Sequence, residues 1–93
     1  MIELGGNIKL KGFSELDVAS LVVVKKIVGN YTRELSKIHN DFTELLLELS
    51  SKGSSDFNIN ANFSKKSGNL TSSANGSNLF FTLSAALGNI SKK

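Results

Sequence analysis

The sequence predicts an α+β fold, a two-layer sandwich in which two helices cover one face of a four-stranded mixed sheet. Three observations support this expectation. Apolar residues alternate at every second position in four segments, they recur at three- and four-residue steps in two others, and the segment order is β-α-β-β-β-α. Because each strand then has one apolar face and each helix one apolar stripe, a single shared core buries them all. The 93 residues therefore predict one domain, residues 1–93.

The first strand is expected at residues 2–13. Apolar and basic residues alternate from Ile8 to Lys11, which is the period of a strand with one buried and one solvated face. The pair Gly5-Gly6 leaves two interpretations open. It forms a bulge in a strand that begins near Ile2, which we favour, or it is a lead-in to a strand that begins at Asn7.

The first helix is expected at residues 14–38. Ser14 offers a hydroxyl to cap its first turn, and Glu15 and Asp17 place carboxylates where the helix dipole favours negative charge. A helix of this length also supplies the crossover that lets the first two strands lie parallel. The stripe expected to face the core comprises Leu16, Ser20, Val23, Val24, Ile27, Tyr31, Leu35 and Ile38.

Three further strands are expected at residues 42–52, 56–66 and 68–75, separated by the turns GSS and KKSGN. The last helix is expected at residues 77–91, where either Ser77 or Asn78 can cap it. The side chains expected to face the core are Leu45, Leu47, Leu49, Phe57, Ile59, Ala61, Phe63, Leu70, Ser72, Ala74, Leu79, Phe80, Leu83, Leu87 and Ile90. The solvated face of the sheet is expected to carry Lys9, Lys11, Glu44, Glu48, Asn58, Asn60 and Asn62.

Composition argues against several classes of function. The chain has no cysteine, which excludes disulfides and thiolate metal sites. It lacks the features of a secretory signal and any run of about 18 apolar residues that could span a bilayer, so we expect a cytoplasmic protein without a membrane partner. The net charge of +3 favours a polyanionic partner. We expect no cofactor, no metal ion and no small-molecule substrate.

Groups that could support catalysis are scarce. His39 is the sole histidine and lies near Asp41, a couple that can serve acid–base chemistry, but no second histidine or cysteine accompanies it. We interpret His39 as a loop residue and expect a protein that is not an enzyme, with a small hydrolase as the third alternative. Most aromatic residues fall on core faces, and Phe81 is the one expected to be exposed.

The stretch DFNINANFSKKSGNLTSSANGSNLFFTLSAALGNI, residues 56–90, resembles the second half of the ribosome hibernation-promoting factor family. Members of that family are small ribosome-associated inhibitors whose domain has the same β-α-β-β-β-α order. The first half of the chain agrees with the family in the order of its elements. The matching features are the polar strand at 56–63, the turn, strand and turn at 68–76, and a helix with Asn78, Leu79, Phe80, Leu83, Ala86 and Ile90.

The resemblance implies binding in the decoding channel of the small ribosomal subunit, where basic side chains contact RNA and the protein blocks messenger and transfer RNA. The leading expectation is therefore a non-enzymatic protein that binds the ribosome or a structured RNA. The alternative is a protein-interaction or oligomerisation module with the same fold, whose asparagine-lined sheet face or edge strand pairs with a protein, including a second copy. The residues expected to bind RNA are Lys25, Lys26, Arg33, Lys37, Lys65, Lys66, Lys92 and Lys93.

Overall fold

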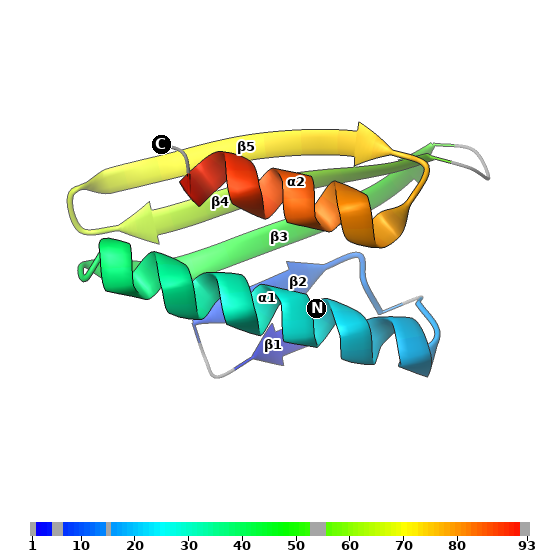
Figure 1. Ribbon diagram of the computed structural model, residues 1–93, viewed down its shortest axis with the longest axis horizontal. Coiled ribbons are helices and arrows are strands. Elements are labelled where there is room, and N and C mark those ends of the chain that lie inside the picture. The colour runs from blue at the N-terminus through cyan, green and yellow to red at the C-terminus, as the bar shows by residue number, and fades with distance from the viewer. Residues whose placement is uncertain (1, 5–6, 15, 53–55, 92–93) are drawn as a thin grey trace.

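The computed structural model describes residues 2–4, 7–14, 16–52 and 56–91 (Figure 1). Its elements, in chain order, are β1 (Ile2–Leu4), β2 (Ile8–Lys11), α1 (Val18–Ile38), β3 (Phe42–Lys52), β4 (Asp56–Lys65), β5 (Gly68–Gly76) and α2 (Leu79–Ser91). Neither helix is long and apolar enough to cross a membrane.

The sheet has the order β1-β2-β3-β4-β5, and the two helices lie side by side on one of its faces (Figure 1). β2 and β3 are parallel because α1 connects them as a crossover, and the other neighbouring pairs are antiparallel. This arrangement confirms the predicted α+β fold with a mixed sheet. We call the sheet face opposite the helices the open face.

The predicted strand at 2–13 is wrong, because it is two short strands and the described sheet has five strands instead of four. β1 and β2 pair antiparallel, with Ile2 opposite Leu10 and Leu4 opposite Ile8. Because the chain reverses between β1 and β2, Ile2 and Leu4 pack against the core. A single continuous strand would have carried them beyond it. The bulge proposed at Gly5-Gly6 lies outside the described residues.

The core lies between the helices and the sheet. The alternation predicted for the later strands is confirmed, since Leu45 and Leu47 of β3 and Ile59 and Phe63 of β4 are fully buried. Burying apolar surface of this kind is the main favourable contribution to folding. The other fully buried apolar side chains of the described residues are Leu10, Phe13, Val24, Val28, Leu35, Leu83, Ala86, Leu87 and Ile90.

The first helix begins later than predicted. α1 starts at Val18, and its N-cap is Asp17, whose Oδ2 accepts a hydrogen bond from the N–H of Ser20 at 3.4 Å. The predicted cap at Ser14 is wrong because residues before Asp17 form a turn that inserts Phe13 into the core, where it is 0% exposed. An irregular segment is needed to bury that side chain immediately after a strand. Glu15 lies outside the described residues.

The buried stripe of α1 is displaced from the predicted one. Val24 and Leu35 face the core as expected, whereas Val23 is 40% exposed and Ile38 is 63% exposed. Val28 and Thr32 are buried instead. Thr32 is tolerated there because its hydroxyl donates to the carbonyl of Val28 at 2.7 Å.

The second half of the chain follows its sequence pattern closely. β4 and β5 pair in continuous register, and β3 pairs with β4 continuously from Glu44 to Lys52 after a register shift between Phe42 and Glu44. Residues 66–67 form the two-residue turn between β4 and β5. Asn78, one of the two caps considered for α2, accepts a hydrogen bond on its Oδ1 from the N–H of Phe81 at 3.0 Å. In the β3–β4 register Lys52 is opposite Asp56, the first residue of β4. It therefore lies at the opposite end of β4 from Lys65 and the β4–β5 turn.

Candidate nucleic-acid interface

Three of the predicted basic residues share the solvent side of α1. Arg33 lies seven positions after Lys26 and Lys37 four positions after Arg33, spacings close to whole helical turns. All three side chains are exposed, and the buried residues Val24 and Val28 lie on the other side of the helix. We call Lys26, Arg33 and Lys37 the cationic stripe.

Lys25 is exposed but does not belong to the cationic stripe. It immediately precedes Lys26, so it points about 100° away around the helix. Glu34 is the only acidic residue within α1, and its Oε1 lies 3.8 Å from Nζ of Lys37. An exposed ion pair of this length contributes little, about 0–1 kcal/mol, and does not remove Lys37 from solvent. The helix surface therefore stays positive.

The β4–β5 hairpin lies at the same end of the molecule as the C-terminal end of α1 (Figure 1). Lys65 and Lys66 each contact the loop that follows α1. The N–H of Lys66 donates to the carbonyl of Asp41 at 3.0 Å, and Nζ of Lys65 lies 3.1 Å from Nδ1 of His39. Lys65 is half-buried and Lys66 is exposed. The cationic stripe thus ends beside two further lysines.

The carboxylate of Asp41 binds the β4–β5 hairpin to this loop through hydrogen bonds. Its Oδ2 accepts hydrogen bonds from the hydroxyl of Ser67 at 2.7 Å and from the N–H of Ser67 at 3.0 Å. The hydroxyl contact is the main reason that the pKa of Asp41 lies below the ordinary value of 3.8, and the charge of Lys65 adds to it. The carboxylate therefore stays ionised at neutral pH and offsets part of the positive charge of Lys65.

Asp41 is expected to make folding sensitive to acid. A lowered pKa in the folded state contributes stability above the ordinary pKa, and that contribution disappears as the pH falls through the folded value. Between about pH 5 and about pH 3, Asp41→Asn should therefore lose less stability than the unmodified protein, measured by urea unfolding. Ser67→Ala, which removes the hydroxyl donor, should flatten the same profile. Identical acid slopes in all three proteins would contradict this role for Asp41.

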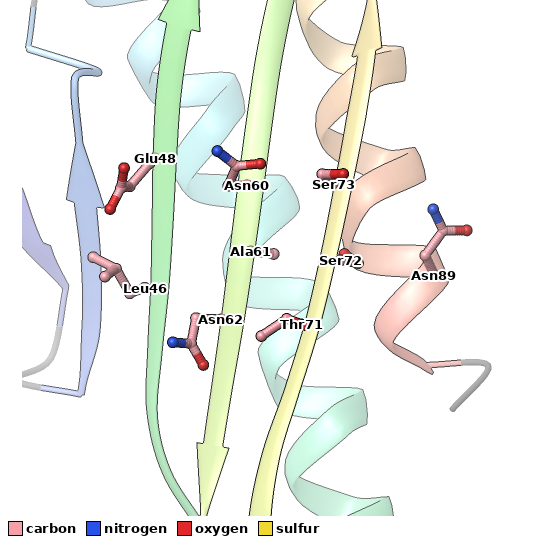
Figure 2. Close-up of a pocket in the computed structure, with 9 residues that line it drawn as sticks. All are labelled: Leu46, Glu48, Asn60, Ala61, Asn62, Thr71, Ser72, Ser73 and Asn89. Atoms are coloured by element: carbon pink, nitrogen blue, oxygen red, sulfur yellow. The ribbon is translucent and has the colours of Figure 1, made fainter.

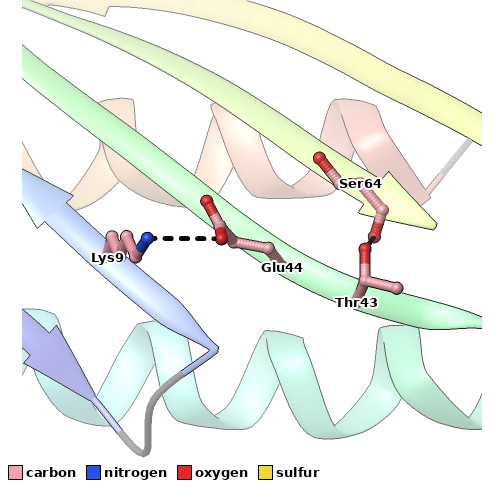
Figure 3. Close-up of polar contacts among 4 residues, drawn as sticks. All are labelled: Lys9, Thr43, Glu44 and Ser64. Atoms are coloured by element: carbon pink, nitrogen blue, oxygen red, sulfur yellow. Dashed lines mark hydrogen bonds and ion pairs between the residues drawn. The ribbon is translucent and has the colours of Figure 1, made fainter.

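The open face of the sheet has no excess of positive charge, and Glu3 lies opposite Lys9 in the β1–β2 register. Nζ of Lys9 lies 3.4 Å from Oε2 of Glu44 (Figure 3), and Lys11 is directly opposite Glu48 in the β2–β3 register. Beside Glu44, the hydroxyl of Thr43 donates to the carbonyl of Ser64 at 3.0 Å (Figure 3). The excess positive charge of the described residues is therefore on the helix side.

A shallow hollow of about 880 Å³ lies on the open face towards β5 (Figure 2). Asn60 and Asn62 of β4 and Ser73 of β5 supply much of its lining, and Glu48 is its charged group. Amide and hydroxyl groups can donate and accept hydrogen bonds, but they do not neutralise phosphate. The residues that line the hollow offer polar contacts, and none of them is a lysine or arginine that could neutralise phosphate.

The structure brings together only part of the predicted set. Lys26, Arg33 and Lys37 are aligned, Lys65 and Lys66 lie near their C-terminal end, Lys25 is offset, and Lys92 and Lys93 lie outside the described residues. His39 contacts Lys65, which the sequence did not predict because 26 positions separate them. No group of three or more His, Cys, Asp or Glu side chains within the described ranges could hold a metal ion. Phe81 is 78% exposed, as predicted.

Comparisons with known proteins support the fold. No protein-family model and no curated protein matches the sequence. The structure is similar to that of a ribosomal subunit interface protein from Coxiella burnetii, with a TM-score of 0.66 over 92% of this chain and 88% of that chain. The two sequences are 9% identical over this similarity. The likeness agrees with the predicted resemblance at the level of the fold.

Proposed function

We propose that this chain is a non-enzymatic protein that binds the ribosome or a structured RNA and acts by occupying a site on the small subunit. The observation that carries the proposal is the cationic stripe, which is exposed on the face formed by the helices. The fold of a ribosomal subunit interface protein, matched over most of both chains, supports the same partner class. The open face, which has no excess of positive charge, then points away from the RNA.

The proposed mechanism is electrostatic attachment of a rigid body. Lysine and arginine side chains displace the counterions held by RNA phosphates, and this release supplies much of the affinity at low salt. Arg33 is suited to a bidentate phosphate contact, whereas Lys26 and Lys37 act as point charges. Further contacts around the stripe would come from Lys25, Lys65, Lys66, Lys92 and Lys93. The bound domain would block the site by its volume.

The test is co-sedimentation with ribosomes and isolated small subunits of the source organism at low and high salt. The double variant Lys26→Gln, Arg33→Gln should bind about tenfold more weakly, because it loses two exposed phosphate contacts. The slope of the logarithm of its binding constant against the logarithm of salt concentration should become shallower by about one unit for each lost contact. The matched control is Lys9→Gln, Lys11→Gln, which removes the same charge from the open face and should bind like the unmodified protein.

Two outcomes would contradict the proposal. The unmodified protein would stay unbound even at low salt, or the two double variants would lose affinity equally. The first outcome would favour the alternative of a protein-interaction or oligomerisation module. Phe81 and Val18, each 78% exposed, are the most exposed of the large apolar residues that the structure describes, and such a partner could cover them. Salt-tolerant self-association in analytical ultracentrifugation would then support that alternative.

A further inference from the structure

The contact between Lys65 and His39 indicates which tautomer the neutral histidine adopts. Nζ of Lys65 lies 3.1 Å from Nδ1 of His39 in a half-buried position. An ammonium group has three donors and no acceptor, so Nδ1 must accept the hydrogen bond. An imidazole that accepts on Nδ1 carries its proton on Nε2 and is neutral.

His39 is held in place from several directions. Its N–H donates to the carbonyl of Leu35 at 2.8 Å, and its ring packs against Phe63 with centroids 5.5 Å apart. The backbone bond holds the residue at the end of α1, and the contact with Phe63 packs one side of the ring against the core. Any change in its charge is felt by the lysine beside it.

The charged groups around His39 leave a net positive cluster. Lys65 from β4 touches the ring, and Lys66 follows it in the turn. Asp41, two residues along the same loop, contributes one negative charge against these two lysines, and its Oδ2 accepts two hydrogen bonds from Ser67. On α1, Lys37 is paired with Glu34 at 3.8 Å. His39 is the C-cap residue of α1, where the partial negative charge of the helix end favours a cation.

We propose that His39, Lys65 and Lys66 form an oxyanion site that strengthens when His39 takes up a proton. Protonation removes the acceptor of Lys65 and places a second cation about 3 Å from it. An oxyanion that accepts a hydrogen bond from each cation resolves this repulsion. Proton uptake and anion binding therefore favour each other, and the coupling is reciprocal. Affinity should fall as the pH rises through the range in which histidines lose their charge, about pH 5 to 8.

The ligand class is an accessible oxyanion of the phosphodiester type. The site lies at a hairpin tip with Lys66 exposed, so it can reach the backbone of a large polyanion and does not enclose a small one. Assigning RNA phosphate as the occupant rests on the proposed function. The site would add a pH-dependent contact at the end of the cationic stripe.

Sulfate tests the site without RNA, because its charge stays constant over this interval. The backbone amide signals of Lys66 and Ser67 would be followed by NMR during sulfate titration at about pH 7.5 and about pH 6. We expect about threefold tighter binding at the lower pH, the effect of one added exposed charge. His39→Gln keeps an acceptor but gains no proton, so it should bind weakly at both values. His39→Arg should bind at both values as the unmodified protein does at the lower pH.

Lys11→Gln, on the open face, serves as the control away from the site and should keep the pH dependence. The inference is overturned if sulfate binds the unmodified protein equally at both pH values, or if His39→Gln keeps the difference. Circular dichroism at both values would verify that each variant is folded, and the opposite expectations for the glutamine and arginine variants keep the test decisive if one of them fails to fold.

Ribosome co-sedimentation at the same two pH values distinguishes the sources of the anion. If RNA phosphate occupies the site, the unmodified protein should bind more tightly at the lower pH and His39→Gln should not. A sulfate effect without any ribosome binding would refute the proposed function and leave the oxyanion site standing. Ribosome binding with the same pH dependence in both proteins would refute RNA as the occupant of this site.

Discussion

Replacing Phe63 by alanine should destabilise the protein by about 3–5 kcal/mol, the range for removing a large aromatic side chain from a core. Phe63 is 0% exposed, and its ring stacks on that of Phe42 with centroids 4.8 Å apart and planes 12° apart. The truncation would lose this contact and leave a cavity beneath the end of α1. Since small domains are stable by only about 5–15 kcal/mol, the variant should be partly unfolded or close to it.

Phe81→Ala is the matched control for this prediction. It removes the same atoms from a side chain that is 78% exposed, so it should change stability by about 0.5 kcal/mol or less. Urea unfolding followed by circular dichroism measures both variants. A comparable loss of unfolding free energy in the two variants would contradict the view that burial of Phe63 stabilises the fold. Because the ring of His39 packs on Phe63, the first variant should also loosen the oxyanion site.

Phe63 illustrates what the sequence could predict. Its strand alternates apolar and polar residues without interruption, and period-2 alternation depends only on neighbours along the chain. The spacing of Leu83 and Leu87 in α2 is local in the same way. Such local patterns predict these elements correctly. A strand and a helix that each have one apolar face must bury those faces in a shared core, which predicts the layered fold.

The misplaced features depend on contacts between distant residues. Both Ser14 and Asp17 are competent helix caps, and the burial of Phe13 decides between them. Val23 and Val28 both suit an apolar stripe, but Val28 is 0% exposed and Val23 is 40% exposed in the folded protein, where α1 packs against α2 and β3. At the N-terminus, alternation over a few residues cannot distinguish one strand from a tight pair of strands.

The candidate site divides in the same way. The stripe of Lys26, Arg33 and Lys37 is a spacing within one helix, so a sequence can reveal it. The partnership of His39 with Lys65 exists because the β3–β4 register brings Lys65 opposite Phe42, next to the loop after α1. No local pattern encodes that register. A histidine with one acidic neighbour in the sequence therefore gave no sign that its contact in the fold is a lysine.

Gly12→Ala should be the second severe variant, with a loss of roughly 2–5 kcal/mol. Gly12 has φ +83°, in the left-handed region that costs other residues about 1–2 kcal/mol. It also follows β2 directly, against β3. An added Cβ would overlap the carbonyl oxygen of Leu49 and lie 3.3 Å from its carbonyl carbon. Both atoms are backbone, so the relief requires β2 and β3 to separate, and overpacking of this kind costs about 1–3 kcal/mol more.

Gly29→Ala is the control, and its expected effect has the opposite sign. Gly29 lies within α1, and a Cβ there meets nothing within 4 Å. Alanine in a helix interior should then stabilise the protein by about 0.5–1 kcal/mol. Thermal and urea unfolding of the two variants would measure the difference. If Gly12→Ala were as stable as the unmodified protein, the close approach of Gly12 to the backbone of Leu49 would be contradicted. The path of the chain from β2 into α1 would then have to be revised.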